Sequence, residues 1–328
     1  MSTHLVRSEG IFHGLPTYPD SVKDLTAIIT GANGISGYHM VKALAAAPQR
    51  WKKIYCLSRR PPPDYFFSDL GKDASSRVEH VSVDFLSDPA AIAESLRAKI
   101  QHVDHVFFFS YMHASLKSGS MWADADALVE TNSTLLGNFI EGLKQANLIP
   151  KRFLLQTGAK HYGFHIGPAT NPSFESDPRI TLEPNFYYSQ EDILASFCKE
   201  HKLHWNVTRP SYIIGAVRGN LLNHAVGLAV YASVQAHLGR PIIFPSDYIA
   251  WDREHCQSSA MLNGYFSEWC VLSDTEDEAF NIQDGQPFTW GRMWPYLASW
   301  YGVAWEGPEK DESKYRTTTT GQEATPRG

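Results

Sequence analysis

The sequence predicts a doubly wound α/β fold, built on a parallel sheet and followed by a smaller, mainly helical C-terminal substrate lobe. Between residues 25 and 210, short apolar runs rich in β-branched residues alternate with longer helical stretches. Such alternation implies parallel strands joined by right-handed crossovers, and strands that are apolar throughout are expected where helices cover both faces of a sheet. After residue 210 the alternation stops and tryptophans become frequent, which indicates a second part of different construction.

The individual elements follow from local pattern and length. The first strand is expected at residues 25–30 (LTAIIT), a short apolar run typical of a buried strand. Further strands are expected at residues 53–58, 78–84, 105–110, 152–158 and 204–210. Helices are expected between them, at about residues 37–47, 90–100, 124–146 and 185–201.

The same patterns divide the chain into four parts. These are an N-terminal arm (1–24), the cofactor-binding α/β domain (25–210), the lobe (211–307) and a charged, threonine-rich tail (308–328) that is expected to be disordered. Within the lobe, a long helix is expected at about 221–238. The aromatic residues of the lobe are equally consistent with an apolar substrate pocket and with a core.

The bulk composition excludes several classes of function. The chain has 328 residues, 43% of them hydrophobic, and its net charge of −6 without a basic stripe argues against a nucleic-acid partner. The cysteines and histidines show no metal-ligand spacing, so no metal is expected. No run of about 18 apolar residues and no hydrophobic targeting segment occur, so we expect a cytoplasmic protein without a membrane span. The sequence leaves both a monomer and a homodimer open.

A glycine-rich segment, TGANGISG, lies between the first strand and the first helix. Gly31 allows a tight turn, Gly34 lets the backbone approach a pyrophosphate, and Gly37 lets helix and strand pack closely. The phosphates would then lie at the N-terminus of the helix, which predicts a dinucleotide site in a Rossmann-type domain. The cofactor contacts expected in this segment also include Thr30, Asn33 and Ile35.

The end of the second strand indicates which dinucleotide is bound. An NAD site usually has an acid there for the ribose 2′-hydroxyl, whereas an NADP site has arginine for the 2′-phosphate. Here Ser58 is followed by Arg59 and Arg60, and a guanidinium binds a phosphate in a forked geometry, so NADPH is the expected cofactor. Asp84 and Phe85, at the end of the third strand, are expected beside the adenine, with a strand-end cap as the alternative for Asp84.

Two adjacent tyrosines, Tyr187 and Tyr188, open the last helix of the α/β domain. In short-chain dehydrogenases a helical tyrosine acts with a lysine one turn later, but here that turn brings Glu191 and Asp192. These acids are better explained by a favourable interaction with the helix dipole than by acid–base chemistry. The lysine must therefore come from elsewhere.

Lys160, in TGAKHYG, is the best candidate for that lysine. It lies just past the carboxyl end of the fifth strand, at the edge where open parallel sheets bind ligands, and could reach the tyrosine from a neighbouring loop. The single Tyr-x-x-x-Lys, Tyr38 to Lys42, lies in the helix behind the phosphates and is attributed to chance. Other cofactor contacts expected at this edge are Ser110, Tyr111, Gln156, Thr157 and Ile214.

Together these segments resemble the progesterone 5β-reductase and iridoid synthase family of extended short-chain dehydrogenases. The resemblance rests on TGANGISG, SRRP, TGAKHYG and NFYYSQED, and extends over about residues 25–302. It implies that Lys160 and the second tyrosine, Tyr188, are catalytic and contact the cofactor, with Tyr187 as packing. It also implies hydride transfer from NADPH to the β-carbon of an enone or enal, with the tyrosine donating a hydrogen bond to the carbonyl oxygen.

Two departures from the family leave the substrate open. Members of the family continue with further C-terminal helices, whereas this sequence ends in a polar tail, and residues 251–272 match their counterpart poorly. We expect a small lipophilic carbonyl compound of secondary metabolism. A ketone reductase using the same residues, and a non-redox isomerase or cyclase, are the alternative functions.

Overall fold

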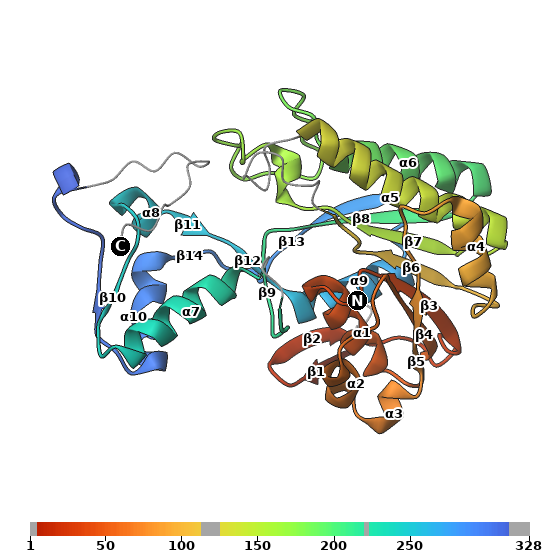
Figure 1. Ribbon diagram of the computed structural model, residues 1–328, viewed down its shortest axis with the longest axis horizontal. Helices are drawn as coiled ribbons and strands as arrows, with labels where there is room; N and C mark the ends of the chain where they lie inside the picture. The colour runs from red at the N-terminus through yellow and green to blue at the C-terminus, as the bar shows by residue number, and fades with distance from the viewer. Residues whose placement is uncertain (1–4, 113–124, 220–222, 315–328) are drawn as a thin grey trace.

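The computed structural model of the chain describes residues 5–112, 125–219 and 223–314. Its centre is a seven-stranded parallel sheet with the strand order β13-β8-β7-β6-β3-β4-β5 (Figure 1). The six strands expected from sequence are confirmed as β3 (Leu25–Thr30), β4 (Trp51–Ser58), β5 (Val78–Ser82), β6 (His105–Phe108), β7 (Arg152–Gln156) and β8 (His204–Pro210). The strand order reverses between β3 and β6, and this switch point is where doubly wound sheets bind ligands.

Helices cover both faces of the sheet, which confirms the predicted fold class (Figure 1). One face carries α1 (Ile35–Ala45) and α9 (Ala260–Leu272), which pack against each other. The other carries α4 (Pro89–Arg97), α5 (Ala125–Ala146) and α6 (Phe186–His201), whose core with the sheet is centred on Phe108, Phe139 and Phe153. Two short helices, α2 (Asp64–Leu70) and α3 (Lys72–Ser75), follow β4.

The prediction that residues 211–307 form one separate lobe is wrong. The chain returns to the α/β domain as α9 and then as β13 (Glu278–Ile282), which pairs in parallel with β8 and becomes an edge of the sheet. The α/β domain therefore includes residues 260–282. The short run EAFNI carried too little pattern to be recognised as a seventh strand.

A buried carboxylate anchors α9 beneath the sheet. Glu268 is 1% exposed, and its Oε1 accepts hydrogen bonds from Arg50 Nε at 3.0 Å and from Trp51 Nε1 at 2.7 Å. Arg50 Nη2 also lies 3.0 Å from this oxygen. The bonds join the last part of α9 to the start of β4, and they fix the layer that also contains α1.

The N-terminal arm contains a β-hairpin of β1 (Val6–Glu9) and β2 (Phe12–Pro16). Leu15 of the hairpin is buried against Tyr265 of α9 and Ala43 of α1. The arm thus packs on the same helical layer that Glu268 anchors.

The remaining lobe contains the helices α7 (His224–His237), α8 (Tyr248–Asp252) and α10 (Trp290–Tyr301). Its short strand pairs are β9 (Tyr212–Ile214) with β12 (Gln257–Ser259), β10 (Ile242–Ile243) with β15 (Trp305–Glu306), and β11 (Glu254–His255) with β14 (Phe288–Thr289). Trp290 and Trp294 form its core with Ile242 and Phe244, so these tryptophans are core residues.

The tail predicted to be disordered lies mostly outside the described residues, which end at the short helix η2 (Glu312–Lys314). Within the described part of the chain, no helix combines the length and apolar character that a membrane span requires.

Candidate active site

A cavity of about 490 Å³ opens at the switch point, over the carboxyl ends of the central strands. Most of the predicted cofactor contacts line it: Gly31, Asn33, Gly34, Ile35, Gly37, Ser58, Arg59, Asp84, Phe85, Ser110, Tyr111, Gln156 and Thr157. Five predicted residues lie outside its lining: Thr30, Arg60, Lys160, Tyr188 and Ile214. Most of the residues predicted to contact the cofactor therefore share one cavity, and their contacts with a cofactor stay predictions.

The glycine loop forms a close-fitting floor for this cavity. Gly31 has φ +62°, and a Cβ there would lie 2.8 Å from the carbonyl oxygen of Phe109. A Cβ at Gly37 would overlap the backbone of Gly31. Gly34 occupies the N-cap of α1, so the first N–H groups of the helix meet no side chain at the cap position. This backbone fits a pyrophosphate, which a helix N-terminus stabilises.

Thr30 holds this loop against the next strand and does not line the cavity. Its side chain is fully buried, and its Oγ1 accepts hydrogen bonds from the backbone N–H groups of Phe109 and Ser110 at 3.1 and 3.2 Å. Thr30 thus has a structural role at the strand end, and the cofactor contact predicted for it stays a prediction.

The two arginines after β4 have different surroundings. Arg59 lines the cavity, whereas Arg60 is exposed outside the lining. The Arg60 carbonyl accepts from Asn33 Nδ2 at 2.9 Å and from Ser58 Oγ at 2.8 Å, so the backbone here is fixed. Arg59 is therefore the arginine placed to meet a bound nucleotide.

Asp84 has the strand-end role that the sequence offered as the alternative, and the predicted adenine contact stays a prediction. It lines the cavity, and its Oδ1 also accepts a hydrogen bond from the backbone N–H of Leu86 at 3.0 Å. The second bond orients the carboxylate at the end of β5.

The two adjacent tyrosines face different surroundings, and Tyr188, which was predicted to be catalytic, does not line the cavity. Tyr187 lines the cavity, with its hydroxyl oxygen 3.1 Å from where a Cβ of Gly158 would stand. The hydroxyl of Tyr188 donates to the carbonyl of His161 at 2.6 Å and accepts from the N–H of Ile180 at 2.8 Å. Successive residues of an α-helix point about 100° apart, which is consistent with the different surroundings of the two tyrosines.

Burial perturbs both phenols of the cavity wall. It raises the pKa of Tyr187 well above its usual range. It does the same for the pKa of Tyr111, to which the neighbouring Tyr187 adds. Both groups are therefore protonated, and able to donate a hydrogen bond, throughout the physiological pH range.

Lys160 lies in the short helix η1 (Ala159–Tyr162), directly after β7. It is 7% exposed, and its Nζ is 3.8 Å from Oε1 of Glu183. Burial lowers the pKa of Lys160, and the carboxylate of Glu183 opposes this effect. Asn185, the N-cap of α6, donates through Nδ2 to the Lys160 carbonyl at 3.2 Å, so the loop lies beside the helix start as expected.

Glu191 and Asp192 each pair with an arginine. They lie in α6 beyond its first turn, which corrects the prediction that they interact with the helix dipole. Glu191 Oε1 lies 3.3 Å from Arg209 Nη2 and 3.5 Å from His161 Nδ1. Asp192 pairs with Arg179 at 2.8 Å. Burial would raise the pKa of Glu191, but His161 and Arg209 outweigh it and the pKa is lowered.

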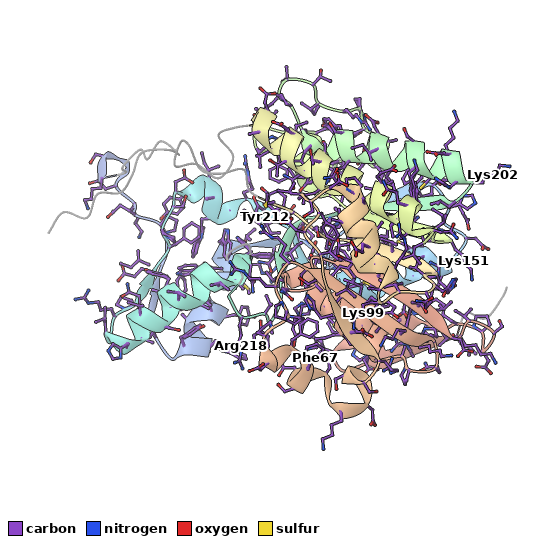
Figure 2. All side chains as sticks on the ribbon, turned by 45° about the vertical axis from the view of Figure 1, so that its right-hand side comes forward. Phe67, Lys99, Lys151, Lys202, Tyr212 and Arg218 are labelled. Carbon is purple, nitrogen blue, oxygen red and sulfur yellow. The ribbon has the colours of Figure 1, made fainter. Side chains whose placement is uncertain are left out.

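Several lining residues escaped the sequence prediction. They are Ser36, Val83, Phe109, Met112, Leu135, Phe186, Gln190, Ser211, Tyr212 and Ile213, together with Tyr187, which was assigned to packing. Some follow strand ends directly, and that position was the signal available in the sequence. Tyr212 stacks on His224 with ring centroids 4.8 Å apart and lies at the junction of lobe and α/β domain (Figure 2).

Known proteins resemble this chain over most of its length. Curated relatives include a short-chain dehydrogenase of Penicillium aethiopicum, 33% identical over 85% of this chain and 71% of its own. The 3-oxo-Δ4,5-steroid 5β-reductase of Arabidopsis thaliana is 30% identical over 90% of this chain and 74% of its own. An (S)-8-oxocitronellyl enol synthase of Camptotheca acuminata is 32% identical over 89% of this chain and 72% of its own. The chain spans about two thirds to three quarters of the length of the curated relatives it matches.

Solved structures share the fold at low identity. An epimerase of Methanothermobacter thermautotrophicus aligns with a TM-score of 0.66 at 15% identity, covering 90% of this chain and 83% of that one. The PRISE-like Rossmann-fold domain matches residues 27–317. This match confirms the resemblance to the progesterone 5β-reductase and iridoid synthase family seen in the sequence motifs. The chain therefore belongs to the PRISE-like Rossmann-fold domain family.

Proposed function

We propose that the protein is an NADPH-dependent reductase that reduces the C=C bond of an enone or enal. The observation that carries this proposal is that one cavity brings together the glycine loop, Arg59 and the phenol of Tyr187. When bound, NADPH would supply a hydride to the β-carbon of the substrate. A proton from solvent completes the α-carbon, so that an enone, NADPH and H⁺ become a saturated ketone and NADP⁺.

The protein's contribution to this chemistry is the placement of a hydrogen-bond donor. Negative charge develops on the carbonyl oxygen as the enone becomes an enolate, and a donor aimed at that oxygen stabilises it. Tyr187 is the phenol that lines the cavity, and its raised pKa keeps it protonated. We therefore assign the donor role to Tyr187 in place of Tyr188. Lys160 would support the cofactor ribose and the phenol from the adjoining loop.

The substrate class follows from the cavity wall and the relatives. The lining includes the apolar or aromatic residues Met112, Phe186, Tyr212 and Ile213, which suits a lipophilic compound. The Arabidopsis relative is named for a 3-oxo-Δ4,5-steroid, in which an oxo group lies next to a double bond. We infer that this chain acts on a lipophilic α,β-unsaturated carbonyl compound of secondary metabolism.

The position of the transferred hydride tests the proposed reaction. With NADPH deuterated at the transferring position and an enone that turns over, we expect deuterium on the β-carbon of a saturated ketone. Deuterium on a carbinol carbon, with the double bond intact, would identify a ketone reductase. Product formed without oxidation of NADPH would instead identify an isomerase or cyclase.

Removal of the Arg59 guanidinium should reduce the preference for NADPH. Hydrogen bonds to charged groups contribute about 1.5–3 kcal/mol each, so Arg59→Ala should raise the NADPH Michaelis constant about tenfold or more and leave NADH nearly unchanged. Arg60→Ala is the matched control, because Arg60 lies outside the cavity lining, and it should have the smaller effect. Equal losses for NADPH and NADH in Arg59→Ala would show that Arg59 does not contact the 2′-phosphate.

Removal of the Glu183 charge should shift the pH at which NADPH affinity and turnover decline on the alkaline side. Glu183 raises the pKa of Lys160, so Glu183→Gln should lower that pKa further. The ammonium is then lost at a lower pH, and the high-pH decline of NADPH affinity and turnover should shift to lower pH. The pH profiles of both quantities measure this, with Glu94→Gln on the exposed side of α4 as control. An unchanged alkaline limb would contradict the role of Lys160.

A further inference from the structure

The start of α6 and its N-cap hold the backbone of the loop that carries Lys160 at two consecutive carbonyl groups. Asn185 Nδ2 donates to the carbonyl of Lys160 at 3.2 Å. The hydroxyl of Tyr188 donates to the next carbonyl, that of His161, at 2.6 Å. Two consecutive peptide groups at the lysine are thereby bonded to one short segment, which also carries Tyr187.

Tyr188 joins both ends of the loop that follows Lys160. Its hydroxyl oxygen also accepts a hydrogen bond from the N–H of Ile180 at 2.8 Å, so one phenol bridges residues 161 and 180. A phenol hydroxyl can donate and accept at the same time, whereas a phenyl ring offers neither a donor nor an acceptor. Phenylalanine would leave two backbone groups without their partner, and such losses are costly in partly buried positions.

The surroundings of Tyr188 hold its ring in place. The Arg179 guanidinium lies over the ring at 5.1 Å and pairs with Asp192 at 2.8 Å. The ring of His161, which is 2% exposed, meets the Tyr188 ring edge-on at 5.1 Å, and its Nδ1 lies 3.5 Å from Glu191. Both neighbours of the ring are held by carboxylates of α6: Arg179 pairs with Asp192, and His161 lies beside Glu191. These carboxylates occupy the turn in which other short-chain dehydrogenases carry the lysine.

We propose that Tyr188 and Asn185 are positioning residues, which hold the backbone at Lys160 against the start of α6, the segment that also carries Tyr187. In this arrangement the helix supplies the tyrosine directly and the lysine indirectly, through hydrogen bonds to the backbone of a neighbouring loop. The inference rests on the proposed role of Lys160 in binding the cofactor.

A double-mutant cycle on NADPH affinity tests this inference without any substrate. The proteins are the wild type, Tyr188→Phe, Lys160→Ala and the double variant, titrated with NADPH by fluorescence. Each single variant should weaken binding about tenfold, and the double variant should be no weaker than the poorer single one, because residues that act as one unit are not additive. Tyr55→Phe is the matched control. It also loses a phenol bond to a backbone carbonyl, that of Lys99 at 3.1 Å, but Tyr55 does not line the cavity, so this variant should bind NADPH normally.

Asn185→Asp provides a second variant should Tyr188→Phe fold poorly. The aspartate keeps the oxygen that caps the N–H of Tyr187 but loses the donor to the Lys160 carbonyl. It should weaken NADPH binding in the wild type and have no further effect in Lys160→Ala. Additive losses in either cycle, or unchanged NADPH affinity in both Tyr188→Phe and Asn185→Asp, would overturn the inference.

The same titrations separate this inference from the proposed function. If the wild type binds NADPH but reduces no enone, the proposed function fails while the cycles still decide the positioning role. If Lys160→Ala binds NADPH as tightly as the wild type, Lys160 is not part of the cofactor site and the positioning role fails with it.

Discussion

Replacement of Tyr187 by phenylalanine should lower turnover about 10²–10⁴-fold, the usual contribution of a proton donor placed at the reacting atom. Phenylalanine keeps the ring that packs between Phe186 and Gly158 and removes only the hydroxyl that faces the cavity. The proposed pyrophosphate site is the glycine loop between β3 and α1, whereas Tyr187 lies in α6, so the affinity for NADPH should change little. Single-turnover rates with NADPH and a reactive enone, together with a fluorescence titration of NADPH, measure the two quantities separately.

Tyr188→Phe is the control that distinguishes the neighbouring phenols. It should act mainly on NADPH affinity, through Lys160, and should reduce turnover at saturating NADPH far less than Tyr187→Phe. A large loss of turnover in Tyr188→Phe with a nearly normal Tyr187→Phe would return the catalytic role to Tyr188. In that case the loop must rearrange when ligands bind, because the Tyr188 hydroxyl is engaged by His161 and Ile180.

The α/β domain could be predicted from sequence because its signals are local. Strands such as LTAIIT consist of apolar and β-branched residues, and β3 has the predicted bounds, Leu25–Thr30. The glycine loop could also be predicted from sequence, and Gly31 and Gly37 lie where a Cβ would collide with backbone atoms. At Gly37 the colliding backbone is that of nearby Gly31, whereas at Gly31 it is that of distant Phe109. The spacing of the glycines between a strand and a helix is nevertheless a local pattern, so a single sequence reveals the loop.

The choice between Tyr187 and Tyr188 could not be made in this way. Both residues open the same helix, and which of them faces the cavity depends on the rotation of α6 against β7 and β8. That rotation is fixed by distant partners, among them Arg209, which pairs with Glu191, and His161, whose carbonyl binds Tyr188. The residue-by-residue transfer from a family motif is ambiguous at adjacent identical residues, because the motif alone does not determine this angle.

The seventh strand and the division of the lobe depend on long-range pairing in the same way. β13 is short and only partly apolar, and it becomes a strand because β8 offers an open edge beside it. α9 returns to the α/β domain because Glu268 meets Arg50 and Trp51 there. Neither partner is near in sequence, so local periodicity could not reveal the return of the chain.

The anchor at Glu268 leads to the largest expected effect on stability. Removing one partner of a buried ion pair leaves an uncompensated charge, here Arg50, which is 6% exposed, and costs about 3–5 kcal/mol. Glu268→Ala should lower the free energy of unfolding by about that amount, measured by urea denaturation at constant m-value. Glu79→Ala is the matched control, because Glu79 pairs with Lys53 of the same strand β4 at 2.7 Å but in a part-exposed position, and should cost only about 0–1 kcal/mol.

Glu268→Gln separates the charge of this anchor from its shape. The amide keeps an oxygen for the Trp51 indole at nearly the same place but loses the charge that Arg50 requires. Its unfolding free energy should therefore fall between those of the wild type and Glu268→Ala. The packing of α9 on α1 links this anchor to the glycine loop, so both Glu268 variants should also bind NADPH less tightly, with Glu268→Ala the weaker. A Glu268→Ala variant as stable as Glu79→Ala would show that apolar packing alone, and not the buried carboxylate, holds α9 beneath the sheet.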